Sequence, residues 1–338
     1  MIELKVCKTS SESENNTFKA ISEALSALPS NPFEIAHILI SPGCYHEKLE
    51  IRRDNLIIEG TGSFSSDTEI TFDDCARDDM PDGTKRGTFR SYSVFIDAKN
   101  VTVKNLTISN LSGPENKAWQ AIALYADGDE LFFENVRLIS HQDTLFTGPL
   151  PPKELQPGGF IGPKQFDERI VGKQYYRNCY ICGNVDFIFG SAEAVFEKCT
   201  IESIARSFEA DKAEGKPVHG YVTAPSTPEG EAIGYIFMEC DFVSKECPAG
   251  SVYLGRPWRD YAKAVFIDCR MGDHIKSEGF HDWGKPLARE ESFFAIYNCF
   301  RENGQAYAAS ESFAKNLEQF EAETYIDFAQ KISKIRGV

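Results

Sequence analysis

The order of hydrophobic and polar positions divides the chain into a short helical start, a long β-rich middle and a helical end. The segment TFKAISEALSALP at 17–29 has apolar residues three or four positions apart, with Asn16 or Thr17 as an N-cap and Pro29 after the last turn. This spacing predicts one amphipathic helix. The segment at 311–337 returns to helical spacing and predicts one or two further helices.

Seven short segments between these helices share one alternating pattern, as in VTVKNLTI, QYYRNCYI and AVFIDCRM. Aligned with one another, they place an apolar residue at one repeat position: Leu106, Val136, Cys179, Cys199, Cys240, Cys269 and Cys299. The repeat position recurs every 20 to 43 residues, which is typical of architectures built from one supersecondary unit per repeat. Because the short strands follow one another without long helices, a parallel β-helix is favoured over a βαβ sheet.

The whole chain is expected to form one domain over residues 1–338, because repetitive all-β architectures of this size often form a single domain. Within it we predict an N-terminal cap over 1–30 and a C-terminal helical tail over 305–338, since the ends of a solenoid need covering. Residues 148–172 are rich in proline and glycine and have no period, which predicts an inserted loop. Loops of this length tend to be functional.

Five of the ten cysteines occupy the repeat position, so their thiols are expected to form a reduced ladder inside the solenoid. The CYIC segment at 179–182 matches a C-x-x-C pattern. On a strand, however, residues three apart point to opposite faces, which argues against metal chelation.

Composition and charge exclude several classes of partner. The chain has 42% hydrophobic and 26% charged residues and a net charge of −15 without a basic run, which argues against nucleic-acid and membrane partners. The start of the sequence lacks a basic segment followed by an apolar one, and no apolar run approaches the ~20 residues of a membrane span. We therefore expect a cytoplasmic protein; the oligomeric state stays open.

Candidate chemistry lies in polar residues inside hydrophobic strand patterns, since the sequence has no nucleophile elbow, HExxH helix, P-loop or dinucleotide fingerprint. Each polar residue alone has an ordinary structural explanation. Together, in consecutive coils, they can line one groove, where carboxylates divide acid and base roles, amides stabilise an oxyanion and arginine keeps a carboxylate ionised. They are Gln120, Gln142, Asp143, Asp186 and Arg256.

The chain also resembles the pectin methylesterases over most of its length, from about Gly43 to Trp283. Five segments match the signatures of that family in order: GCYHE at 43–47, QAIAL at 120–124, QDTL at 142–145, DFIFG at 186–190 and LGRPW at 254–258. The resemblance implies a right-handed parallel β-helix that removes the methyl ester from C6 of galacturonate in pectin, giving acid and methanol. It implies no metal and no organic cofactor.

By motif match, the resemblance implies a role for each of the five polar residues. Asp186 corresponds to the nucleophile, and Asp143 to the acid that protonates methanol and then to the base that activates water. Gln142 would donate to the oxyanion, with Gln120 assisting and holding substrate. Arg256 would pair with Asp186 and orient it.

The resemblance also implies substrate-binding positions. Trp258 matches the sugar-stacking residue, and Tyr125, Phe146 and Phe189 match aromatic positions along the groove. Phe189 reaches the groove only if its strand bends or bulges near the end. Ser93 lies where the family often has a substrate-binding threonine.

Two departures from the family pattern stand out. Asp143 and Asp186 are 43 positions apart, roughly twice the family spacing, and the excess is the loop at 148–172. We hypothesise that this loop walls or lids the groove and restricts substrate length. Phe280 lies where relatives commonly have a second tryptophan.

Two other functions remain open from the sequence. One is a β-helix glycoside hydrolase of polygalacturonate that uses Asp143 and Asp186 as its carboxylate pair. The other is a non-catalytic pectin-binding solenoid. A lyase is disfavoured, because no acidic loop resembles a Ca²⁺ site. If the protein is cytoplasmic, imported methylated oligogalacturonides rather than polymeric pectin are the expected substrate, and the charge of −15 disfavours movement along a polyanion.

Overall fold

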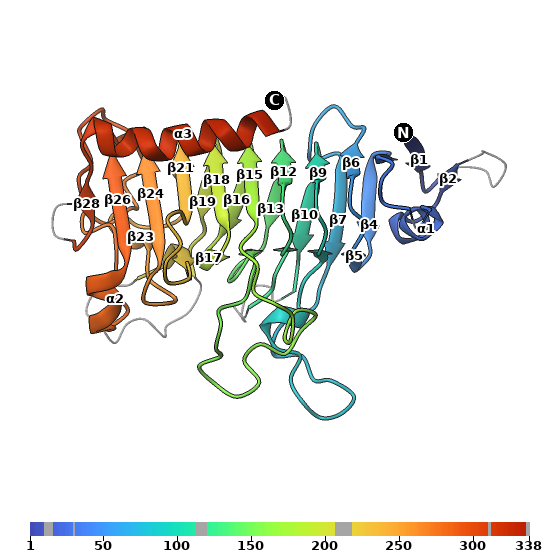
Figure 1. Ribbon diagram of the computed structural model, residues 1–338, viewed down its shortest axis with the longest axis horizontal. Helices are drawn as coiled ribbons and strands as arrows, with labels where there is room; N and C mark the ends of the chain where they lie inside the picture. The colour runs from blue at the N-terminus through green and yellow to red at the C-terminus, as the bar shows by residue number, and fades with distance from the viewer. Residues whose placement is uncertain (10–15, 30, 113–119, 207–217, 310–311, 336–338) are drawn as a thin grey trace.

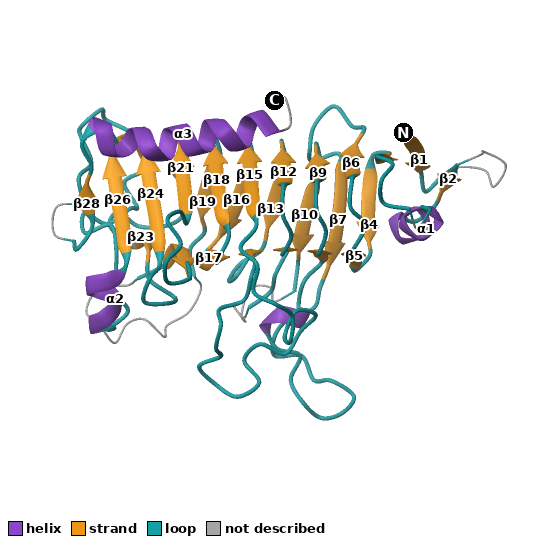
Figure 2. Cartoon of the chain, viewed as in Figure 1, coloured by secondary structure: helices purple, strands orange, loops and turns teal. Residues whose placement is uncertain are grey.

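The computed structural model describes the chain except for residues 10–15, 30, 113–119, 207–217, 310–311 and 336–338. Its described strands form three parallel sheets, and the chain passes through the three in turn, one coil after another (Figure 1, Figure 2). The fold is the right-handed parallel β-helix that the sequence predicted.

The three sheets, here called A, B and C, have these strand orders within the described residues. Sheet A contains twelve strands: β2 (Thr17–Phe18), β1 (Ile2–Val6), β3 (Ala36–Ile40), β6 (Leu56–Gly60), β9 (Val101–Lys104), β12 (Leu131–Glu134), β15 (Lys173–Arg177), β18 (Glu193–Glu197), β21 (Tyr235–Met238), β24 (Lys263–Ile267), β26 (Phe293–Tyr297) and β28 (Lys315–Asn316). Sheet B contains nine strands: β27 (Phe300–Arg301), β25 (Arg270–Met271), β22 (Asp241–Val243), β19 (Thr200–Ser203), β16 (Tyr180–Gly183), β13 (Arg137–Ile139), β10 (Thr107–Asn110), β7 (Thr68–Phe72) and β4 (Gly43–His46). Sheet C contains seven strands: β23 (Val252–Gly255), β20 (Gly220–Pro225), β17 (Val185–Gly190), β14 (Leu145–Thr147), β11 (Leu124–Ala126), β8 (Val94–Ile96) and β5 (Leu49–Ile51).

The turn from sheet A to sheet B uses one residue with a left-handed backbone, immediately before the repeat position. Asparagine and aspartate tolerate this conformation better than other non-glycine residues, which explains why they predominate here. Side chains at this turn position also form hydrogen bonds between neighbouring coils; for example, Asn135 Nδ2 donates to Asn105 Oδ1 at 2.8 Å. The φ angles are 49–54° at Asn105, Asn135, Asn178, Lys198, Glu239, Asp268 and Asn298.

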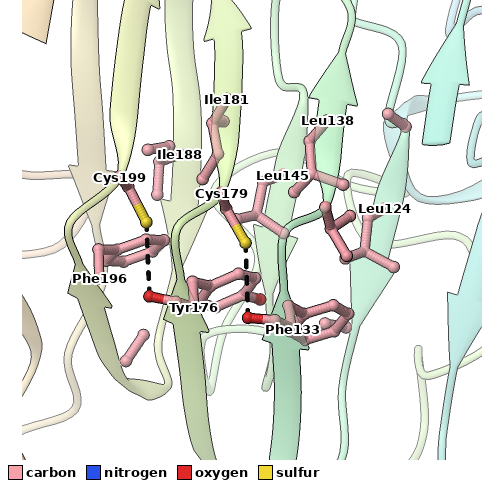
Figure 3. Close-up of a cluster of buried hydrophobic side chains, with 14 of the residues drawn as sticks. Leu124, Phe133, Leu138, Leu145, Tyr176, Cys179, Ile181, Ile188, Phe196 and Cys199 are labelled. Atoms are coloured by element: carbon pink, nitrogen blue, oxygen red, sulfur yellow. Dashed lines mark hydrogen bonds between the residues drawn. The ribbon is translucent and has the colours of Figure 1, made fainter. Parts of the chain in front are cut away.

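The predicted cysteine ladder is present inside the solenoid. The five repeat-position cysteines are buried and free, and each Sγ donates to a carbonyl of the preceding coil, as Cys179 does to Phe133 and Cys199 to Tyr176 (Figure 3). Burial raises the pKa of Cys199 well above its ordinary value, so this thiol stays protonated. Beside the ladder, five rings stack with centroids 4.5–4.8 Å apart: Phe133, Tyr176, Phe196, Phe237 and Phe266.

The N-terminal helix α1 (Ile21–Ala27) packs Ile21 and Ala24 into the end of the core, which agrees with the predicted cap. Its predicted start was wrong, because Thr17 belongs to β2 and pairs with Lys5 of β1. The N-cap also differs: the Glu47 carboxylate accepts the backbone N–H groups of Ile21 (2.9 Å) and Ser22 (3.0 Å). The GCYHE motif therefore ties the first helix to the solenoid.

The C-terminal segment departs from the prediction of a helical end cap. Helix α3 (Gln319–Ile335) lies along the outer face of sheet A (Figure 1), where Ala329 and Ile332 join outward side chains such as Tyr175 and Val265. Before it, β28 continues sheet A, so the tail from 305 is not wholly helical. The remaining helices are η1 (Thr88–Arg90) and α2 (Pro286–Glu291). No described helix is long and apolar enough to cross a membrane.

Candidate active site

A bulge in strand β17 directs Asp186 out of the solenoid. Val185 pairs with Tyr221 and Ile188 with Thr223, so β17 carries one more residue than β20 between these pairs. Asp186 adopts a left-handed backbone (φ 50°), and Phe187 and Ile188 both face the core. The bulge reverses the alternation, and Phe189 therefore reaches the cleft described below. The sequence predicted a bend or bulge near the end of this strand if Phe189 was to reach the groove. The bulge is present, but it lies at Asp186, three residues before Phe189.

Arg256, which follows β23, holds both oxygens of Asp186. Its Nε donates to Oδ1 at 2.8 Å and its Nη2 to Oδ2 at 2.7 Å. The guanidinium carbon lies 3.7 Å from the ring centroids of Tyr221 and of Trp283. Burial by itself would lower the pKa of Arg256, but the charge and hydrogen bonds of Asp186, together with smaller contributions from Tyr221 and Asp143, raise it. This bidentate, ring-stacked geometry holds the carboxylate in one orientation.

Asp143, Gln142 and Gln120 come from the two preceding coils. Gln120 and Gln142 form a parallel β-bridge, and the Asp143 amide donates to the Val185 carbonyl at 3.1 Å, next to Asp186. Asp143 also has a left-handed backbone (φ 64°). Trp283 (φ 58°) is the third left-handed, non-glycine residue of the cleft, and such residues are typical of functional positions that the surrounding structure holds in place.

Asp143 and Asp186 differ in their electrostatic surroundings. Burial raises the pKa of Asp143 well above its ordinary value, and the charge of Asp186 raises it further. The charge of Arg256 and a hydrogen bond with the Gln142 side chain act in the opposite direction without cancelling the shift. The site therefore pairs an arginine-bound carboxylate with a buried carboxyl group whose pKa is raised.

A cleft of about 440 Å³ joins the five polar residues, which the structure brings together as expected. Trp258 and Phe189 line it, in agreement with their expected positions. Lys285 Nζ donates to the carbonyls of Pro257 (2.9 Å) and Trp258 (3.2 Å) and so supports the turn that carries the tryptophan. Further lining residues that sequence reasoning missed are Thr88, Phe89, Leu155, Gln156, Gly159, Phe160, Ala224, Arg259 and Trp283.

Three expected substrate contacts do not line the cleft. Tyr125 and Phe146 are fully buried, because Phe89 lies against both rings, with centroids 5.9 and 5.0 Å away. Ser93 is also fully buried and donates from Oγ to the Ser109 carbonyl at 2.7 Å. The expected sugar contacts of these three residues are therefore corrected: they support the wall of the cleft.

The structure shows what replaces the second tryptophan that relatives commonly have at the position of Phe280. Phe280 is buried in the core against Phe266 and Phe294. Trp283, three residues further along, lines the cleft and stacks on Arg256. Trp283 therefore supplies the aromatic ring at this end of the cleft, three positions after the residue where relatives commonly have tryptophan. The sequence signal for it was the HDW segment at 281–283.

No group of three or more His, Cys, Asp or Glu in the described part of the chain is placed to hold a metal ion. The polar atoms of the cleft instead pair with one another, as carboxylate with guanidinium and carboxyl with amide. The arrangement can supply a nucleophilic carboxylate, an acid and amide N–H donors.

Comparisons with known proteins agree with this geometry. A family model described as pectinesterase matches residues 7–149 and 170–319. The chain is 31% identical over 307 residues to pectinesterase QRT1 of Arabidopsis thaliana, covering 90% of this chain and 71% of that protein. It is 30% identical over 364 residues to pectinesterase A of Dickeya chrysanthemi, covering 97% and 89%.

Solved structures give the same result. A pectin methylesterase in complex with a hexasaccharide has a TM-score of 0.75 and 27% identity, covering 96% of this chain and 95% of the other. The matched family residues include all five polar residues of the cleft. The chain belongs to the pectinesterase family.

Proposed function

We propose that this protein hydrolyses the C6 methyl ester of galacturonate units in pectin or in methylated oligogalacturonides, with Asp186 as nucleophile. The observation that carries the proposal is the pairing of an Arg256-bound carboxylate with the buried Asp143, whose pKa is raised, beside two amide side chains in one cleft. Membership of the pectinesterase family supports the same reaction.

In the first half of the reaction, an oxygen of Asp186 attacks the ester carbonyl carbon and forms a tetrahedral intermediate. Gln142 has two amide N–H groups, so it can bond Asp143 and still donate to the developing oxyanion, with Gln120 assisting. When the C–O bond to the methyl group's oxygen breaks, Asp143 gives its proton to the leaving methoxide. Methanol departs, and the galacturonoyl group stays on Asp186 as a mixed anhydride.

In the second half, Asp143 is an anion and takes a proton from water. The resulting hydroxide attacks the anhydride, galacturonate leaves as the free acid, and Asp186 returns as a carboxylate held by Arg256. Asp143 ends protonated, ready for the next ester. Every proton and electron pair is accounted for by the substrate, one water and these two side chains.

Substrate binding relies on the aromatic lining of the cleft. Trp258 and Trp283 present indole rings, and sugar rings stack on such faces. A related pectin methylesterase has been solved with a hexasaccharide, which supports an oligogalacturonide as the ligand here. The cytoplasmic location expected from the sequence stays a prediction.

The assay that separates the esterase from a glycoside hydrolase follows two products. Methylated oligogalacturonide is incubated with the protein, and methanol and new reducing ends are measured in the same sample. The proposal expects methanol without new reducing ends. New reducing ends without methanol would support the hydrolase and contradict the proposal, and neither product would support a non-catalytic solenoid.

A further inference from the structure

The segment between β14 and β15 is an addition to the family pattern. The family match stops at residue 149 and resumes at 170, so residues 150–169 lie outside it. Figure 1 shows the segment leaving the sheets as a long loop, beside the loop that carries η1. We call residues 150–169 the insertion.

The insertion is held together by its own hydrogen bonds. The Glu154 carboxylate accepts the backbone N–H groups of Gly158 (3.1 Å) and Phe160 (3.4 Å). The Arg169 guanidinium donates to the carbonyls of Lys164, Gln165 and Asp167 at 2.6–2.7 Å. These bonds link distant parts of the loop to one another, and we therefore expect it to act as a fixed wall rather than as a mobile lid.

The insertion is also tied to the rest of the chain at two places. Near its C-terminal end, Lys164 forms an ion pair with Asp97 at 2.8 Å, and Gly162 lies so close to Phe89 that an added Cβ would approach the Phe89 Cβ to 2.7 Å. Near its N-terminal end, Arg259 Nη2 donates to the Lys153 carbonyl at 3.1 Å.

Phe160 is the centre of this wall. Its side chain is buried, and its ring centroid lies 5.7 Å from that of Phe89 and 6.2 Å from that of Trp258. Phe89, which precedes the insertion in the chain, lies against the outward rings of Tyr125 on β11 and Phe146 on β14, and Phe160 packs against Phe89 in the same buried cluster. A sugar chain therefore cannot lie on the outer face of these two strands.

On the basis of the proposed function, we propose that the insertion ends the substrate groove over β11 and β14 and makes this protein selective for short methylated oligogalacturonides. A polymer must enter a groove at one end and leave it at the other, whereas a short oligomer needs only the open part. The remaining cleft of about 440 Å³ lies within the range of pockets that hold small ligands.

The test compares methanol release per ester bond from methylated oligogalacturonides of graded length and from polymeric pectin. The wild type is expected to have a higher kcat/KM for short oligomers than for polymer. Replacing residues 151–168 by two glycines, or Phe160→Ala, should raise the polymer-to-oligomer ratio of kcat/KM, by about tenfold or more for the deletion, because it removes a steric exclusion.

Phe166→Ala is the matched control, since Phe166 belongs to the same insertion but is 91% exposed and does not line the cleft. Its ratio should equal that of the wild type. If the deletion variant does not fold, the comparison of Phe160→Ala with Phe166→Ala decides. Equal use of polymer and oligomers by the wild type, or an unchanged ratio in a folded Phe160→Ala variant, overturns the inference. Absence of methanol from every substrate would instead overturn the proposed function.

Discussion

Asp143 and Asp186 carry the same side chain in different surroundings, and this difference is what the proposed reaction uses. Asp186 has a guanidinium on both oxygens, whereas Asp143 is buried beside the negative charge of Asp186. In the proposed reaction, Asp186 is the nucleophile and Asp143 the acid at the same pH.

The raised pKa of Asp143 predicts the pH dependence of ester cleavage. Proton donation to the leaving methoxide requires the protonated form, so kcat/KM should fall as the pH rises through the pKa of Asp143. Because that pKa is raised, the alkaline limb should lie well above the ~4 of an ordinary aspartate. The measurement is kcat/KM for a fully methylated oligomer across pH. A decline centred near pH 4 would contradict this assignment of the acid.

Glu47 shows that a family motif can be structural. Its carboxylate accepts two N–H groups at the start of α1, at 2.9 and 3.0 Å, far along the chain from the cleft motifs. Glu47→Gln should lower the free energy of unfolding by roughly 1 kcal/mol, because an amide places N–H groups against N–H donors. Urea denaturation measures this loss, and Glu3→Gln at an exposed position of β1 is the control. Lost methanol release from folded Glu47→Gln would indicate a role beyond capping.

The polar residues of the cleft could be predicted because each one interrupts a hydrophobic strand pattern within an ordered motif. The sequence did not predict three aromatic residues of the cleft, because they lie on loops or on the short helix η1, where no hydrophobic period indicates the path of the chain. These are Phe89, Phe160 and Trp283. Tyr125 and Phe146 point outward as expected, but side chains from distant loops cover them. Burial by a non-local segment is not visible in a local pattern.

At the scale of elements, the strands were predictable and the position of α3 was not. The repeat pattern marks the strands, and a left-handed residue such as Asn105 or Asn135 marks their turns. Sheet A has outward apolar residues as well as inward ones, for example Tyr175 and Val195. This second apolar face was the available signal that a helix covers the side of the solenoid rather than its end.

The packing of α3 on sheet A can be tested with a matched pair of variants. Ala329 is buried against the outer face of sheet A, and its neighbour Gln330 is exposed. Ala329→Glu should place a charge in an apolar contact and lower the free energy of unfolding by roughly 2–4 kcal/mol. Gln330→Glu should change it by less than about 0.5 kcal/mol. Chemical denaturation of both variants checks this; equal stability would mean that α3 does not pack as described.

At the scale of the whole molecule, the net charge of −15 opposes an anionic substrate. Each ester cleaved adds a negative charge, so repulsion grows as the substrate loses its methyl groups. Raising the ionic strength from about 0.01 to 0.15 M shortens the Debye length from about 30 to 8 Å and should weaken that repulsion.

Salt should therefore raise kcat/KM for a largely de-esterified oligomer and leave the value for a fully methylated oligomer nearly unchanged. The measurement is initial methanol release from both substrates at the two ionic strengths. A fall in kcat/KM with salt for the de-esterified oligomer would mean that cations beside the cleft, such as Arg259, dominate the encounter.

The proposed role of Asp186 as the nucleophile of an esterase can be tested by replacing its carboxylate. Methanol release from methylated oligogalacturonide is compared among the wild type, Asp186→Asn and Asp241→Asn, with folding checked by thermal unfolding. Asp241 on β22 is the control, because it pairs with Arg270 at 2.8 Å but does not line the cleft. Asp186→Asn should lose on the order of 10⁴-fold or more in kcat while remaining folded, and Asp241→Asn should keep its activity. Substantial methanol release by folded Asp186→Asn would mean that Asp186 is not the nucleophile.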